Sequence, residues 1–333
     1  MEIISVIIPC RNEEKYIADC LDSVVKTDYP KDCMEVFVID GQSSDTTRKI
    51  VESYTKKFNF IHLMLNKNLT VPYAMNMGIK ESRGNYIIRL DAHGVFPNNY
   101  FSELVNSSKK LDADNIGATW ITDVKNKNPK TNAIKTVLSS KFGVGDSIFR
   151  IGGIEQAMEV DTVPFGCYKK DVFNKIGFYD YRLTRNQDVE LNKRLKRNGG
   201  RIYLLPDLFS IYYARETFWG IANNNFATGL WNILTVYITR RVTSLSLRHF
   251  IPLLFLLSLI LSLISMIWIP SLGYIALSSF ALYALTLLIV SLKVTKKGTS
   301  IYYTAWAFLV LHFSYGFGSL LGIFRIDLLF KRR

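Results

Sequence analysis

The sequence has few cysteines, and it lacks the glycine-rich motif that is typical of dinucleotide-binding proteins. The chain of 333 residues has only four cysteines, and their spacing fits no C-x-x-C metal or redox pattern. So few cysteines in a chain of this length also argue against a disulfide framework, and we expect Cys10, Cys20, Cys33 and Cys167 to be reduced. No G-x-G-x-x-G motif follows the first apolar run, which argues against a dinucleotide-binding oxidoreductase.

A leader sequence and a nucleic-acid motif are also missing. The first apolar stretch, residues 3–8, is too short for the h-region of a signal peptide. The net charge of +13 favours an anionic partner such as nucleic acid, acidic lipid or a phosphorylated substrate, and composition alone does not choose among them. Because no nucleic-acid-binding motif accompanies the charge, we expect no nucleic-acid partner.

Up to about residue 248 the sequence alternates short apolar runs with segments of helical periodicity. This alternation predicts an α/β fold with a mostly parallel, doubly wound sheet, in which ligands bind at the carboxyl ends of the strands. Asp40 and Asp91 each follow directly after an apolar run, so both are expected at that edge. The expected strands are 3–8, 36–39, 60–65 and 86–90, and the expected helices are 13–25, 44–54 and 73–82.

Three long apolar segments follow, at 250–269, 274–292 and 301–324. Each is long enough to cross a hydrocarbon core of roughly 30 Å at about 1.5 Å per residue, which predicts a membrane anchor. Basic residues near the first two segments place the N-terminal domain in the cytosol by the positive-inside rule. Three crossings would leave Lys331, Arg332 and Arg333 outside, unless glycines 316, 318 and 322 let the last segment break or re-enter. The cytosolic clusters are Arg240, Arg241 and Arg248, and Lys293, Lys296 and Lys297.

These patterns divide the chain into a catalytic domain at 1–214, a linking region at 215–248 and a transmembrane region at 249–333. The linking region carries apolar and aromatic residues with arginines at its ends. It is interpreted as amphipathic helix lying on the bilayer, and the alternative is a helix that packs against the sheet.

Four polar clusters stand at expected strand or helix ends, at residues 9–14, 40–47, 91–93 and 187–191. Taken singly each has a structural explanation, because acidic residues form turns and complement helix dipoles. A carboxylate and an imidazole two residues apart, as in Asp91 and His93, are also able to reach one divalent ion. Oxygen ligands favour Mg²⁺, and an imidazole shifts the preference toward Mn²⁺.

Together, in this order, the clusters resemble the family-2 inverting glycosyltransferases, which have the GT-A fold. The resemblance runs from about residue 3 to 203 and rests on V-I-I-P-C-R-N-E-E, V-I-D-G-Q-S-S-D-T-T, A-M-N-M-G-I, D-A-H and N-Q-D-V-E-L. It implies a nucleotide diphosphate sugar donor, with Glu13 near the base and Asp40 on the uracil. It also implies that Asp188 is the catalytic base and that Asp91-Ala92-His93 takes the place of D-x-D. The implied donor-site residues are Pro9, Arg11, Glu13, Asp40, Ser43, Ala74, Asn76, Asp91 and Ala92, and the implied metal ligands for Mn²⁺ or Mg²⁺ are Asp91 and His93.

The sequence departs from that family at three points. His93 replaces the second aspartate of D-x-D, Gln187 replaces an acidic neighbour of the base, and no Q-x-x-R-W motif occurs near residues 223–231. The missing motif favours addition of a single sugar over polymer synthesis. Arg182, Arg185 and Arg215 are further candidates for diphosphate or acceptor contacts.

The D-A-H form, the basic helix after the catalytic part and the L-H-F-S-Y-G-F-G-S tail resemble bacterial enzymes of the succinoglycan type, which act on polyprenyl-diphosphate-linked saccharides. We therefore expect a multi-pass protein of the cytoplasmic membrane that transfers one sugar to a membrane-associated acceptor. The alternative is a catalytically silent scaffold or anionic-lipid-binding protein that keeps the fold.

Overall fold

The computed structural model describes residues 1–325, so the expectation about Lys331, Arg332 and Arg333 lies outside the described residues. The chain forms two compact units. The first comprises residues 1–121 and 152–213, and the second comprises residues 122–151 together with the chain from Ala214 onward. Residues 122–151, which the sequence analysis assigned to the catalytic domain, thus lie in the unit of the C-terminal helices.

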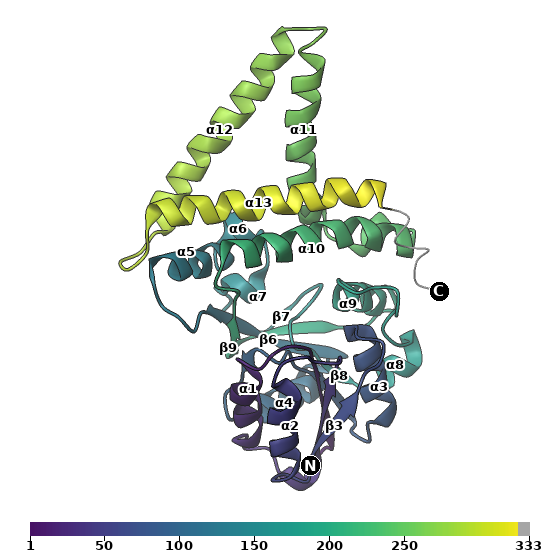
Figure 1. Ribbon diagram of the computed structural model, residues 1–333. Helices are drawn as coiled ribbons and strands as arrows, with labels where there is room; N and C mark the ends of the chain where they lie inside the picture. Colours follow the sequence, from purple (N-terminus) through teal and green to yellow (C-terminus); the bar gives the residue numbers. More distant parts are fainter. Residues whose placement is uncertain (326–333) are drawn as a thin grey trace. The chain divides into compact units, whose positions relative to one another are not determined.

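The first unit is built on a mixed sheet, which has nine strands in the part of the chain that the structure describes (Figure 1). The strand order is β3-β2-β1-β4-β8-β6-β9-β5, with β7 paired to β9. Pairing is parallel among β3, β2, β1 and β4 and antiparallel where β8 meets β4 and β6, and where β9 meets β5 and β7. The strands are β1 Ile4–Cys10, β2 Met34–Asp40, β3 Ile61–Leu65, β4 Tyr86–Arg89, β5 Gly94–Val95, β6 Asn115–Asp123, β7 Met158–Glu159, β8 Cys167–Lys169 and β9 Ile202–Tyr213.

The α/β fold class is confirmed, and the first four strands in the chain pair in parallel. β1 and β2 are buried at nearly every position, as apolar strands covered on both faces must be. Helix α3 lies close against β1, since a Cβ at Gly78 would come within 2.8 Å of the Ile7 side chain. The helices of this unit are α1 Ile17–Val25, α2 Thr47–Thr55, α3 Val71–Glu81, α4 Tyr100–Leu111, α8 Asp171–Ile176 and α9 Gln187–Arg197, with the 3-10 turn η1 Lys31–Cys33.

The register of the parallel strands brings three strand ends to one edge of the sheet. Cys10 at the end of β1 pairs with Asp40 at the end of β2, and Ile7 pairs with Arg89 at the end of β4. The polar residues that follow these strands are therefore neighbours in space. Glu13 and His93, for example, interact although 80 residues separate them in sequence.

The second unit is helical, and residues 122–151 are part of its core. Ile134 and Val137 pack with Phe308 and Leu311 in one buried apolar cluster, which explains why this segment leaves the sheet unit. The elements are α5 Pro129–Leu138, α6 Lys141–Val144, α7 Ile148–Ile151, α10 Phe218–Thr239, η2 Val242–Ser244, η3 Leu247–Phe250, α11 Ile251–Ser265, α12 Ser271–Val294 and α13 Ile301–Phe324.

Three helices of this unit are long and apolar enough to cross a membrane, at Leu247–Ser265, Ser271–Val294 and Ile301–Phe324. They coincide with the three apolar segments expected from the sequence. The helix α10, in the expected linking region, lacks this degree of hydropathy and packs along α13.

Backbone-to-backbone contact holds α10 and α13 together. A Cβ at Gly318 of α13 would overlap the carbonyl oxygen of Phe226 in α10, and a Cβ at Gly322 would lie 2.9 Å from the carbonyl oxygen of Leu230. Glycines at such contacts let two helices approach more closely than any other residue permits.

Gly318→Ala should therefore force α10 and α13 apart and lower the melting temperature of the detergent-solubilised protein. Overpacking of this kind costs about 1–3 kcal/mol. Ser278→Ala, at an exposed position of α12, is the matched control and should leave the melting temperature unchanged. Equal melting temperatures for the two variants would contradict the close packing.

Candidate functional site

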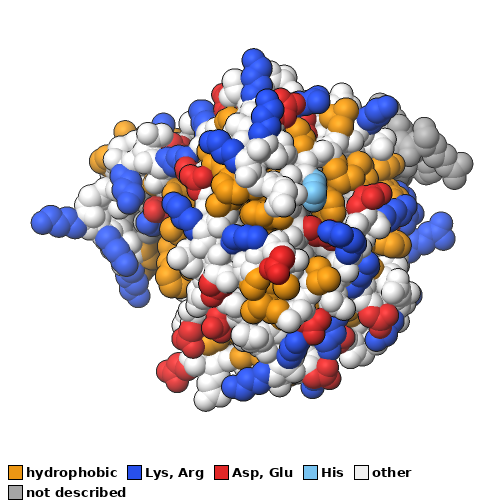
Figure 2. Space-filling model, turned by 90° about the horizontal axis from the view of Figure 1, so that it is seen from below, with side chains coloured by type: hydrophobic (Ala, Val, Ile, Leu, Met, Phe, Trp, Pro, Cys, Tyr) orange, Lys and Arg blue, Asp and Glu red, His pale blue; other side chains and the backbone are white. Residues whose placement is uncertain are grey.

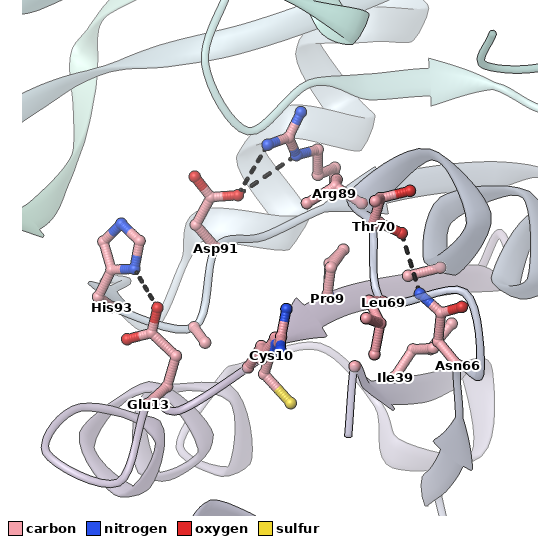
Figure 3. A pocket seen from close by; sticks show the side chains of 15 residues that line it. Pro9, Cys10, Glu13, Ile39, Asn66, Leu69, Thr70, Arg89, Asp91 and His93 are labelled. Carbon is pink, nitrogen blue, oxygen red and sulfur yellow. Dashed lines mark hydrogen bonds and ion pairs between the residues drawn. The ribbon is translucent and has the colours of Figure 1, made fainter. Parts of the chain in front are cut away.

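A cavity of about 210 Å³ lies where β1, β2 and β4 end. Figure 3 shows side chains from these strand ends and from the loops after them converging on it. Cys10 and Ile39 line it, as do residues of the loop after β3. Seven of the residues expected from sequence line it, namely Pro9, Arg11, Glu13, Ala74, Asp91, Ala92 and His93.

Asp91 is paired with the last residue of the strand that precedes it. Its Oδ1 accepts hydrogen bonds from Nη2 of Arg89 at 3.0 Å and from Nε at 3.3 Å (Figure 3). Burial by itself would raise the pKa of Asp91, but the charges of Arg89 and His93 outweigh it and hold the pKa below its ordinary value. Asp91 is therefore a carboxylate at neutral pH.

Arg89 also reaches the residue expected to be the base. Its Nη1 lies 3.6 Å from Oδ2 of Asp188, which stands in the first turn of α9. The backbone N–H of Val189 donates to Asp188 Oδ1 at 2.9 Å. The arginine side chain is only 12% exposed, so one largely buried cation at the end of β4 bridges the carboxylates of Asp91 and Asp188.

His93 forms an ion pair rather than standing free as a ligand. Its Nδ1 lies 3.1 Å from Oε1 of Glu13, and its ring meets Tyr212 edge-on (Figure 3 shows the first contact). Burial would lower the pKa of His93, but Tyr212, the hydrogen bond and charge of Glu13, and the charge of Asp91 together raise it to about 10. The ring is thus an imidazolium at neutral pH.

The loops after β1 and β2 are tied to each other. Asp40 accepts hydrogen bonds from the N–H of Ser43 at 3.0 Å and from its hydroxyl at 2.6 Å. The hydroxyl of Ser43 in turn accepts from the N–H of Asn12, and Asn12 Oδ1 accepts from the N–H of Ser44, both at 2.9 Å. Asp40 and Ser43 therefore lie beside the cavity and shape the loop that lines it, without being part of its lining.

Asn76 lies away from the cavity. Its side-chain amide donates to the carbonyl oxygen of Tyr179 at 2.8 Å and accepts from the N–H of the same residue at 3.0 Å. It is almost fully buried. In this structure Asn76 joins α3 to the segment that leads to α9, and so it supports the position of Asp188.

The sequence reasoning missed Arg89 and the loop after β3. Asn66 follows that strand, its side chain donates to the carbonyl oxygen of Thr70 at 2.9 Å, and Leu69 has a positive φ of 66°. Both Asn66 and Leu69 line the cavity. The rule that ligands bind at strand ends, applied to the third strand as it was to the others, would have found Asn66.

The three candidate arginines do not line the cavity. Arg182 forms a two-pronged ion pair with Asp180 at 2.7–3.2 Å. Arg215 belongs to the second unit. Figure 2 shows basic and acidic side chains interspersed over one face of the molecule, so the excess positive charge forms no continuous basic surface on that face.

A divalent ion would find one suitable ligand here. Within residues 1–325 no three His, Cys, Asp or Glu side chains form a group able to hold a metal. Asp91 fits such an ion because it is an ionised oxygen ligand on the cavity wall. His93 does not fit while it is protonated and paired with Glu13, because an imidazolium has no lone pair to give.

The match to a protein-family model decides the family of the chain. The model of glycosyl transferase family 2 matches residues 5–177, more than half of the chain. The chain belongs to glycosyl transferase family 2. The expected family is thus confirmed, and the matched region contains every strand end that faces the cavity.

The names of two curated relatives of this glycosyltransferase place those relatives in glycan synthesis. One is dolichyl N-acetyl-α-D-glucosaminyl phosphate 3-β-D-2,3-diacetamido-2,3-dideoxy-β-D-glucuronosyltransferase of Methanococcus voltae, 29% identical over 65% of this chain and 68% of that protein. The other is a succinoglycan biosynthesis protein of Rhizobium meliloti strain 1021, 28% identical over 63% of each chain. The matches thus span about two thirds of these relatives.

Among solved structures, the fold is similar to that of a mannosyltransferase from Pyrobaculum calidifontis solved with GDP-mannose and Mn²⁺. The TM-score is 0.61 at 15% identity, over 98% of this chain and 88% of that one. This likeness supports the fold of the glycosyltransferase.

Replacing Arg89 should destabilise the site, because Asp91 and Asp188 would face each other without a counter-charge. Arg89→Met should cost about 1–3 kcal/mol, less than a fully buried pair because both carboxylates are partly exposed. Arg89→Met combined with Asp91→Asn should recover part of that loss. Thermal unfolding measures both effects.

Arg48→Met, which breaks an exposed ion pair with Glu52 on α2, is the control and should change stability by under about 0.5 kcal/mol. A melting temperature for Arg89→Met equal to that of the control would contradict the bridging role.

Proposed function

We propose that this glycosyltransferase transfers a single sugar from a nucleotide diphosphate sugar, with UDP as the nucleotide, to a membrane-associated saccharide. The acceptor is proposed to be linked to a polyprenyl diphosphate, and the reaction to invert the anomeric centre. The observation that carries the proposal is the joining of Asp91, in the cavity wall, to Asp188 through Arg89.

The donor would occupy the cavity at the strand ends. The loops after β1 and β2 offer hydrogen-bonding groups to the nucleotide, and Arg11 and His93 offer positive charge to its diphosphate. The pairing of His93 with Glu13 keeps that charge in place at neutral pH. In this proposal His93 acts on the diphosphate as a cation, in the region where sequence reasoning expected it to act as a metal ligand.

A divalent ion, Mn²⁺ or Mg²⁺, would be held by Asp91. When bound, such an ion neutralises negative charge on a departing diphosphate. Arg89 supports that role by keeping Asp91 ionised and by fixing one of its oxygens.

Asp188 is proposed to act as the general base. It would accept the proton of an acceptor hydroxyl while that oxygen bonds to the anomeric carbon. The bond from that carbon to the donor phosphate oxygen breaks at the same time, and the nucleoside diphosphate leaves with the electron pair. Attack opposite the leaving group turns an α-linked donor into a β-linked product.

The acceptor class rests on the apolar helices and on the relatives. One relative acts, by its name, on a dolichyl-phosphate-linked sugar, and the other belongs to succinoglycan biosynthesis. Three helices apolar enough to cross a membrane would hold the enzyme where such lipids lie. The proposed location is the cytoplasmic membrane, with the sheet unit in the cytosol.

Asp188→Asn tests the assignment of the base. The amide cannot accept the proton, so turnover should fall by about 10²–10⁴-fold while donor affinity stays unchanged. Release of UDP from a panel of UDP-sugars would be measured in the presence of N-acetylglucosaminyl diphosphate farnesol as a short lipid-linked acceptor.

The matched control is Asp180→Asn, since Asp180 is also an ion-paired aspartate but its partner is the exposed Arg182 and not Arg89. Near-normal turnover in Asp188→Asn would remove Asp188 from the role of base. Wild-type protein that binds UDP but transfers to no lipid-linked acceptor would contradict the acceptor class and leave the donor site standing.

A further inference from the structure

Helix α13 follows α10 along its whole length in the second unit. Near the starts of the two helices the rings of Phe218 and Tyr303 lie 6.0 Å apart. Near their ends the hydroxyl of Tyr237 donates to the carbonyl oxygen of Ile323 at 3.3 Å. Asn232 and Tyr315 bond to each other between these points. The two helices therefore run side by side in the same direction, and the depth of α13 in a membrane is set by that of α10.

Helix α10 is poorly suited to a hydrocarbon core. Three consecutive asparagines, 223–225, lie within it, and it is not among the helices apolar enough to span. Arg215 and Glu216 precede it and Arg240 and Arg241 follow it. A helix fixed to α10 over its length shares the polar surroundings that these residues require.

The middle of α13 is covered by a charged helix. α5 packs on it through Ile134 and Val137, and the carbonyl oxygen of Phe142 bonds to His312 Nε2 at 2.8 Å. α5 carries Lys135, whose Nζ lies 2.8 Å from Oδ1 of Asp123. If α13 crossed the bilayer, it would draw these charges toward the hydrocarbon at a cost of about 2.5–3.5 kcal/mol each.

The helices α11 and α12 have the opposite character. In the apolar stretch of each helix, only 17% of α11 and 11% of α12 is buried by the rest of the protein, against 39% of α13. No charged residue occurs from Ile251 to Leu292. Figure 1 shows them leaving the α10–α13 pair as a hairpin, while α13 lies along α10. Basic clusters stand at both ends of this hairpin, at residues 240–248 and 293–297.

The exposed apolar residues of α13 lie towards its two ends and on one side of the helix. Glycines 318 and 322, which contact α10, lie on another side. α13 therefore offers one apolar side to a bilayer while its other side is covered by protein. The exposed residues are Tyr302, Trp306, Phe317, Leu321 and Phe324, and Trp219 of α10 is 75% exposed.

We propose that the chain crosses the membrane twice, through the α11–α12 hairpin, and that α10 and α13 lie together in the plane of one interface, against anionic headgroups. The basic clusters at the base of the hairpin supply the charge that such headgroups attract, about 1 kcal/mol per residue. Both ends of α13 are then on the same side of the membrane. The proposal is independent of the enzymatic activity.

Side-specific cysteine labelling tests the number of crossings. The full chain with Cys33→Ser, which removes the one native cysteine that is not buried, would carry Thr299→Cys, Arg325→Cys or Trp268→Cys. In sealed vesicles of phosphatidylethanolamine and phosphatidylglycerol, an impermeant maleimide should label positions 299 and 325 from the same side. It should label position 268, at the hairpin tip, from the other side. Labelling of 299 and 325 from opposite sides would overturn the proposal.

A depth measurement gives an independent answer if a labelling variant fails to insert. Nitroxides on Tyr302→Cys and Phe317→Cys should sit at the same shallow depth, as judged by their relative accessibility to oxygen and to a nickel chelate. A nitroxide on Ser258→Cys, an exposed position of α11, should be much deeper. A label at 317 as deep as that at 258, with 302 at the surface, would mean that α13 spans.

Discussion

The ion pairs of Arg89 with Asp91 and Asp188 are the constraint on which the site depends. β4 is a buried strand, and its last residue points a largely buried guanidinium between the carboxylate of Asp91, just after the strand, and that of Asp188 in α9. Without that cation, two negative groups would face each other at low dielectric, and neither would keep its position. With it, Asp91 stays ionised in the cavity wall and Asp188 is held beside it. The same interaction links the parallel half of the sheet, which forms the cavity, to the segment of the chain that carries the proposed base.

Hydrophobic periodicity was sufficient to predict the strands and the fold class, because both depend on residues that are near one another in sequence. The apolar runs of β1, β2, β3 and β4 predicted the α/β fold and placed Asp91 at the edge of the sheet, while the resemblance to family 2 implied the seven expected residues that line the cavity. The partners of these residues could not be predicted, because each bond joins segments far apart in sequence. Asn76 bonds to Tyr179, 103 residues away, and His93 meets Glu13 across 80 residues. Arg89 escaped notice because a basic residue inside an apolar strand has meaning only once its two acidic partners are placed.

In the second unit, too, the sequence predicted the helices but not the residues against which they pack. Hydropathy found the three apolar helices, but it carries no information about their direction or about what covers them. Residues 122–151 join this unit through Ile134 and Val137, and close contact between α10 and α13 requires glycine at 318 and 322. Three long apolar segments thus have two different environments, α11 and α12 with most of their side chains exposed and α13 partly enclosed by protein.

The central claim is that the cavity at the ends of β1, β2 and β4 is the nucleotide-sugar site and that Asp91 links it to a divalent ion. Calorimetric titration of UDP into the purified protein, with and without Mn²⁺ and with GDP for comparison, tests this most directly. The account predicts UDP binding that strengthens with Mn²⁺, and loss of the Mn²⁺ effect in Asp91→Ala. Folded protein that binds neither nucleotide under either condition would contradict it, as would an undiminished Mn²⁺ effect in Asp91→Ala.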